Sequence, residues 1–97
     1  MTETYSIGGV PVYVHSVVAL TEFVSRYVVN VLSSRNEATC YFGTFSDNGT
    51  SVSHNNSNPV YVTGSVTFNY SFKGQPTVST TNAFTIFVDS SGAVGIV

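Results

Sequence analysis

The chain has 97 residues, which is enough for one domain, and we expect residues 1–97 to form a single domain in which residues 1–8 are flexible. Only three basic and five acidic residues are present, for a net charge of −2, so no basic surface is available for nucleic acid or anionic lipid. Valine occurs 17 times and Tyr and Phe together 13 times, against two Leu, which argues against an all-helical fold.

Residues 1–34 predict a short strand followed by the only helix of the chain. Residues 10–14 alternate between valine and other residues, and Pro11 places this strand at a sheet edge. In residues 16–34 the apolar side chains recur at spacings of three and four, which predicts an amphipathic helix with Ser16 as its N-cap. The apolar positions are Val17, Leu20, Val24, Tyr27, Val28 and Val31.

Residues 38–73 predict three strands of an antiparallel meander. Residues 38–46 carry apolar side chains at both even and odd positions, which is typical of a central strand. The sequence Asp47-Asn48-Gly49 predicts a hairpin turn to residues 50–54. Residues 60–73 alternate strictly between apolar even positions and polar odd positions, most of which bear a hydroxyl group. This pattern predicts a long, half-buried strand that bends at Gly64.

The pairing of the last predicted strands depends on whether the loops between them have an odd or an even number of residues. In residues 78–88, Phe84, Ile86 and Val88 again lie at even positions, so the loop to the long strand must have an odd length or a bulge must intervene. A three-residue loop, Lys73-Gly74-Gln75, would place Gly64 opposite Phe84. Asp89-Ser90-Ser91-Gly92 predicts a turn that places residues 93–97 beside this strand. The resulting pairs are Val88 with Val94 and Ile86 with Ile96.

These elements predict an α+β fold in which one helix packs on a curved antiparallel sheet of about five to six strands, in the order β-α-β-β-β-β-β. In architecture alone, this layout resembles the cystatin-like and NTF2-like rolls. The Gln-x-Val-x-Gly loop of cystatins is absent, and there is one predicted helix where NTF2-like domains usually have three. The resemblance therefore implies no function.

Few residues are candidates for chemistry, and we predict no catalytic, metal or cofactor site. His15 lies at the predicted junction of strand and helix, where we expect a capping or hydrogen-bonding role, and His54 lies in a polar loop. Asp47 and Asp89 begin turns, where their carboxylates accept hydrogen bonds from backbone N–H groups. The single cysteine, Cys40, is expected to be a buried core residue.

The composition favours a non-enzymatic interaction or structural protein that associates with itself or with another protein. Low charge favours self-association, and a surface rich in Ser, Thr and Asn is common in phage and other viral proteins. The predicted interaction surfaces are two sheet edges, residues 10–14 and 93–97, and the hydroxyl-rich face of the long strand. That face carries Tyr61, Thr63, Ser65 and Thr67.

An alternative is a small-molecule pocket between helix and sheet, which could be enzymatic if His15, Tyr27 or Asp47 pointed into it. Its expected lining is Phe23, Tyr27, Phe68, Tyr70 and Phe84. The start of the chain has no signal-peptide pattern, and no apolar run is long enough to span a membrane. We therefore expect a cytoplasmic protein, or a virion protein if it is viral.

Overall fold

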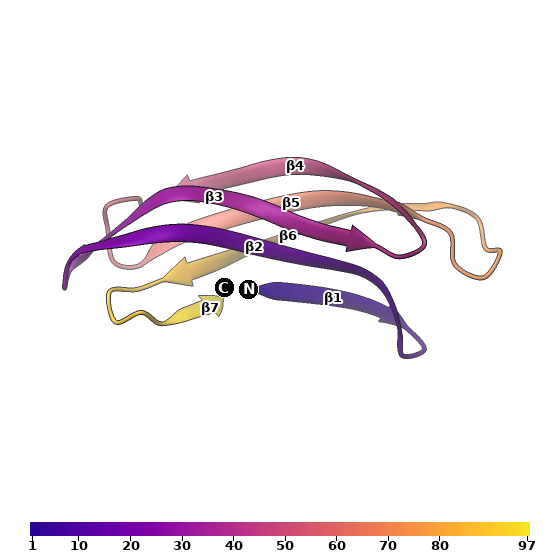
Figure 1. Cartoon of the computed structure of the whole chain (residues 1–97), viewed down its shortest axis with the longest axis horizontal. Coiled ribbons are helices and arrows are strands. Elements are labelled where there is room, and N and C mark those ends of the chain that lie inside the picture. Colours follow the sequence, from indigo (N-terminus) through magenta and orange to yellow (C-terminus); the bar gives the residue numbers. More distant parts are fainter.

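The computed structural model describes residues 1–97 and consists of two antiparallel sheets with no helix (Figure 1). The predicted α+β fold is therefore wrong, and the protein is all-β. The first sheet has the order β1 (Thr2–Ile7), β2 (Val10–Ser25) and β3 (Val28–Cys40). The second has the order β4 (Gly43–Ser53), β5 (Val60–Tyr70), β6 (Val78–Val88) and β7 (Val94–Ile96).

The predicted helix, residues 16–34, is instead the end of β2, a two-residue turn at Arg26 and Tyr27, and the start of β3. The many β-branched valines of this segment favour strands, and the segment forms strands although its apolar residues are spaced as in a helix. The spacing arose because Leu20 and Val24 are apolar side chains on the exposed face of β2, while Val17 lies on its buried face. Apolar residues on both faces hide the two-residue period of a strand.

The N-terminal segment was also predicted incorrectly. Residues 10–14 were expected to form an edge strand, but they begin β2, which pairs with β1 and is the central strand of its sheet. Thr4 lies opposite Val14, and Gly8 and Gly9 form the turn between the strands with φ of +55° and +82°. The edge strand is therefore β1.

The predicted hairpin between residues 38–46 and residues 50–54 does not form. Residues 38–40 end β3, and β4 is a single strand at the edge of the second sheet rather than a hairpin. Asp47-Asn48-Gly49 forms a bulge within β4, where the pairing with β5 shifts between Asp47 and Thr50 and Gly49 has φ of +89°. A turn sequence can serve a bulge because both need a residue with positive φ.

The register of the last three strands was predicted correctly. Gly64 lies opposite Phe84, Val88 opposite Val94 and Ile86 opposite Ile96. In β5 the even residues from Val60 to Tyr70 are all buried and the odd residues are half-buried. Strict alternation along a strand with one covered face therefore determined the pairing.

The two sheets pack face to face and form a flat body of 53 × 23 × 16 Å. The core between them is divided into two clusters. One contains Val17, Val29, Val31, Val60, Val62, Phe84, Ile86 and Val88. The other contains Val12, Tyr13, Val66, Phe68 and Tyr70. Between the clusters lie His15 of β2 and Gly64 of β5.

The close approach of the sheets at Gly64 yields a prediction. An added Cβ would meet the side-chain oxygen of Asn36 and would lie 2.6 Å from Cγ2 of Val17. We expect Gly64→Ala to lower the free energy of unfolding by about 1–3 kcal/mol, the usual range for overpacking. Urea unfolding would measure this loss. Ser65→Ala, which truncates an outward side chain on the same strand, should change it little, and equal stability of both variants would contradict the packing described.

Candidate functional site

His15 is the one fully buried side chain with titratable chemistry, and it connects the two sheets. Its Nε2 lies 2.8 Å from Oδ1 of Asn36 on β3, and its Nδ1 lies 2.7 Å from Oδ1 of Asn82 on β6. The ring packs edge-on against Phe84, with 4.9 Å between ring centroids. Hydrogen bonding was the predicted role of His15, although its position in mid-strand was not predicted.

The amide of Asn36 extends this network to the second sheet. Its Nδ2 donates to Oδ1 of Asp47 at 2.7 Å, and it also lies 2.9 Å from the carbonyl oxygen of Gly49 and 3.1 Å from that of Ser65. Because the amide nitrogen serves these acceptors, the amide oxygen must face His15, so Nε2 of His15 carries a proton and donates it. His15 has no exposed surface, so this network can hold the sheets together but cannot reach a substrate.

The predicted hydroxyl face lies on the outer side of the second sheet. Thr63 shares a 2.7 Å hydrogen bond with Thr85, and Thr67 shares a 2.9 Å bond with Thr81. The amide of Asn48 donates to the hydroxyls of Ser65 and Thr67. Tyr61, Thr63, Ser65 and Thr67 are thus on one face, but three of the four already bond to neighbouring strands.

The aromatic residues of the predicted pocket do not come together. Phe68 and Tyr70 lie in one core cluster and Phe84 in the other, while Phe23 and Tyr27 are exposed at the far end of β2. With no helix, the expected pocket between helix and sheet does not exist. Burial raises the pKa values of the Tyr13 and Tyr70 hydroxyls, which keeps these phenols protonated.

An unpaired stretch of β2 is the feature that the sequence did not reveal. The ladder between β1 and β2 ends at Met1, whose ammonium donates to the carbonyl of Val17 at 3.0 Å and whose carbonyl accepts from the N–H of Val17 at 2.9 Å. Figure 1 shows that β1 runs beside only part of β2. We call residues 18–24 of β2, on the side left free beyond Met1, the open edge.

Backbone groups of Ala19, Thr21 and Phe23 point outward along the open edge. Val17 bonds to Met1, and alternate residues of a strand turn their N–H and C=O groups to the same side. The register between β2 and β3 shifts twice here: between Leu20 and Thr21 the extra residue is Leu32 of β3, and between Phe23 and Ser25 it is Val24 of β2, so the alternation in β2 is regular as far as Phe23. Three donors and three acceptors are therefore available to another strand.

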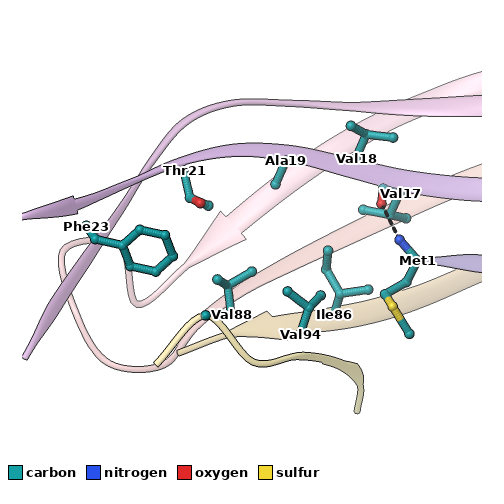
Figure 2. A pocket seen from close by; sticks show the side chains of 10 residues that line it. Met1, Val17, Val18, Ala19, Thr21, Phe23, Ile86, Val88 and Val94 are labelled. Carbon is teal, nitrogen blue, oxygen red and sulfur yellow. Dashed lines mark hydrogen bonds between the residues drawn. The ribbon is translucent and has the colours of Figure 1, made fainter. Parts of the chain in front are cut away.

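An apolar pocket of about 250 Å³ lies beneath the open edge, between the two sheets (Figure 2). From β2 it is lined by Val17, Ala19, Thr21 and Phe23, and on the opposite side by Ile86, Val88 and Val94. Met1 closes one end of the pocket. A strand bound along the open edge would place every second side chain over this pocket.

The same end of the molecule exposes large apolar side chains. Leu20, Phe23, Val24, Tyr27 and Leu32 are each more than half exposed, and all belong to β2, β3 or the turn between them. Apolar side chains gathered in this way often mark an interaction surface. In the sequence, three of these residues, Leu20, Val24 and Tyr27, contributed to the helical spacing, so part of the signal was present but was assigned to the wrong structure.

The buried position of His15 gives a matched comparison with His54, which is exposed. His15→Phe fills a similar volume but leaves the side-chain amides of Asn36 and Asn82 without their ring partner, so we expect a loss of about 1–3 kcal/mol per orphaned group. His54→Asn should alter stability little, because Asn tolerates the positive φ of this position. Urea midpoints of the two variants give the comparison. Equal midpoints would show that the His15 network contributes nothing.

Asp47 gives a prediction about pH. Hydrogen bonds from Asn36 and from the N–H of Gly49 hold the pKa of the Asp47 carboxyl below its usual value of 3.8. The folded state therefore binds this proton less readily than the unfolded state, so the stabilisation is complete above about pH 4 and is lost as pH falls through the folded pKa. Asp47→Asn keeps an acceptor oxygen but cannot titrate, so its stability deficit should shrink between pH 7 and pH 2.

Urea unfolding of both proteins at several pH values would measure this deficit. Glu22→Gln provides the control, because it also removes a carboxylate but the Glu22 side chain is exposed and is not part of the ion pair of the chain. The effect at Asp47 should be small because the side chain is exposed. A deficit that is unchanged from pH 7 to pH 2 would contradict the assigned hydrogen bonds.

The remaining general properties of the chain complete the description of the site. No helix is present that has the length and apolar character needed to cross a membrane. Side chains of His, Cys, Asp and Glu do not gather in groups of three or more that could hold a metal ion. Comparisons with known protein families, with curated proteins and with solved structures found no match to this chain.

Proposed function

We propose that this protein is a non-enzymatic interaction protein that binds an extended strand at the open edge of β2. The observation that carries this proposal is the coincidence of the unpaired backbone of Ala19, Thr21 and Phe23 with an apolar pocket directly beneath it. Addition of a strand to a sheet edge is a common mode of peptide recognition, in which backbone bonds supply affinity and pockets for alternate side chains supply specificity.

The chemistry of the open edge supports binding rather than protection. Exposed edges in monomeric proteins are usually protected by lysine, proline or inward-pointing charges. Here the only charged residue in residues 18–24 is Glu22, and its side chain is exposed on the face away from the pocket. The edge can therefore accept a partner strand without burying a charge.

The pocket defines the kind of strand that would fit. Its walls are Val, Ile, Ala and Phe side chains, so the bound strand should carry apolar residues at every second position. The other face of the bound strand would lie beside the side chains of Leu20, Glu22 and Val24, so it could carry polar or apolar residues. An alternating sequence such as that of β5 has this character.

The hydroxyl face is a weaker candidate for the interaction surface. Three of its four predicted residues already form hydrogen bonds with side chains of the neighbouring strands, so a partner would have to compete with existing hydrogen bonds. The open edge has backbone groups with no protein partner. A binding partner gains more from groups that are bonded only to water than from groups already paired.

A synthetic peptide of alternating valine and threonine, with a lysine at each end for solubility, tests this proposal. Titrated into dilute 15N-labelled protein, it should shift the amide signals of Ala19, Thr21 and Phe23 and slow their hydrogen exchange. Thr21→Pro removes one outward N–H from the open edge without touching the ladder to β3, and we expect it to weaken binding at least tenfold.

Ala83→Pro is the matched control. It removes one outward N–H from the part of the β6 edge that β7 does not cover, at a residue that lines no pocket, and it should leave peptide binding unchanged. Equal losses in both variants would show that the peptide binds any exposed edge. No shift at Ala19, Thr21 and Phe23 at millimolar peptide would reject the proposed site.

A further inference from the structure

We infer that the strand that fills the open edge belongs to a second copy of this chain, and that two copies pair β2 with β2, antiparallel, about a two-fold axis at Thr21. This inference rests on the proposed function and names its partner. A two-fold axis makes the same surface serve both copies, which is the commonest arrangement in protein dimers. Three independent features of the open edge agree on this register.

The first feature is the length of the open edge. It is bounded at one end by Met1, which already occupies the position opposite Val17, and at the other by the turn at Arg26 and Tyr27. With the axis at Thr21, Val18 lies opposite Val24 of the second copy, and Ser25, the last residue of β2, must turn away from the edge because Met1 occupies the position opposite Val17. An axis at Leu20 would place Phe23 and Val24 of one copy, which lie within the strand, on Met1 and Thr2 of the other.

The second feature combines the direction of the backbone N–H and C=O groups, which alternates along the strand, with the position of the charged residue Glu22. Antiparallel pairing places residues with outward backbone groups opposite each other, so a two-fold axis must pass through one residue of each copy. An axis at Glu22 would place the two Glu22 carboxylates directly opposite each other, which is unfavourable. An axis at Thr21 places Glu22 opposite Leu20 and leaves no like charges opposed.

The third feature is the match of side-chain sizes over the pocket. With the axis at Thr21, the small side chain of Ala19 lies opposite Phe23 of the second copy, and both point towards the interior. The Phe23 ring, half exposed in one chain, would then cover the pocket wall formed by Ala19, Ile86 and Val94 of the other. The two threonines at the axis can share a hydrogen bond, a favourable cross-strand pair.

The surface available is sufficient for a weak specific dimer. Covering the open edge, the Leu20, Phe23 and Val24 side chains and the pocket would remove on the order of 600 Å² per copy, about 1,200 Å² in total, which is the lower limit for specific interfaces. Association should therefore be reversible and dependent on concentration. The low net charge of −2 adds little repulsion between copies.

Disulfide trapping tests the register. In a Cys40→Ser background, which removes the only native thiol, Thr21→Cys places two cysteines at the two-fold axis with Cα atoms about 5.5 Å apart, within the disulfide range of about 4.4–6.8 Å. We expect mild oxidation to convert most of the protein into a covalent dimer on a non-reducing gel. Circular dichroism of the reduced variant would confirm that it folds.

Glu22→Cys in the same background is the matched control. Its two cysteines would be diagonal neighbours about 7–8 Å apart, beyond the range for a disulfide without backbone movement. We expect it to cross-link at least tenfold more slowly than Thr21→Cys. Equal cross-linking rates would overturn the register, because random collisions treat both positions alike.

Light scattering of the unmodified protein separates this inference from the proposed function. A concentration-dependent dimer at high micromolar concentration, together with fast trapping of Thr21→Cys, supports the pairing of two copies. A strict monomer that still binds the alternating peptide would overturn the homodimer while leaving the proposed site intact. A strict monomer that binds no peptide would reject both.

Discussion

The hydrogen-bonded bridge from His15 through Asn36 and Asn82 is the interaction on which the rest of the structure depends. It joins β2, β3 and β6 directly, and through Asn36 it reaches Asp47 of β4 and the backbone of β5. A buried imidazole with unpaired nitrogens would be costly, so these partners must stay in place for the sheets to pack. The bridge therefore determines how the sheets align as well as how closely they approach.

The geometry of the bridge also explains the use of glycine at position 64. The Asn36 side chain needs room against β5 to reach His15 and the Ser65 carbonyl, and only a residue without a Cβ leaves that room. The polar layer divides the core into two apolar clusters, each built from both sheets. Such a layer specifies one alignment, because sliding a sheet by two residues would bury His15 against valines.

The open edge results from the unequal lengths of neighbouring strands. β2 has 16 residues and β1 has six, so part of β2 extends past its only neighbour on that side. In the second sheet, β7 has three residues beside the 11 of β6. The pocket lies where the long strand loses its neighbour, since no side chain from β1 reaches that part of the space between the sheets.

The alternation of polar and apolar residues predicted some elements correctly and others incorrectly. In β5, polar and apolar residues alternate along the buried stretch, and Phe84, Ile86 and Val88 continue the same period in β6, so a strand with one covered face was the consistent structure, and the register with β7 followed from it. In β2 and β3, apolar residues occupy both faces near the turn, and the bulges between them interrupt the alternation. The many valines of this segment favour a strand, whereas the spacing of three and four between its apolar residues favours a helix, so the sequence pattern alone allowed both.

What the sequence determined by itself was the β-rich character of the chain, the strand made by β5, and the pairing of β5, β6 and β7, because these depend on side-chain alternation and on turn residues close in sequence. What only the tertiary structure decided was the partnership of His15 with Asn36 and Asn82, which are 21 and 67 residues away, and the place where β1 ends beside β2. Both depend on how two sheets stack. That stacking is set by the sum of many contacts between distant residues, and no local pattern encodes it.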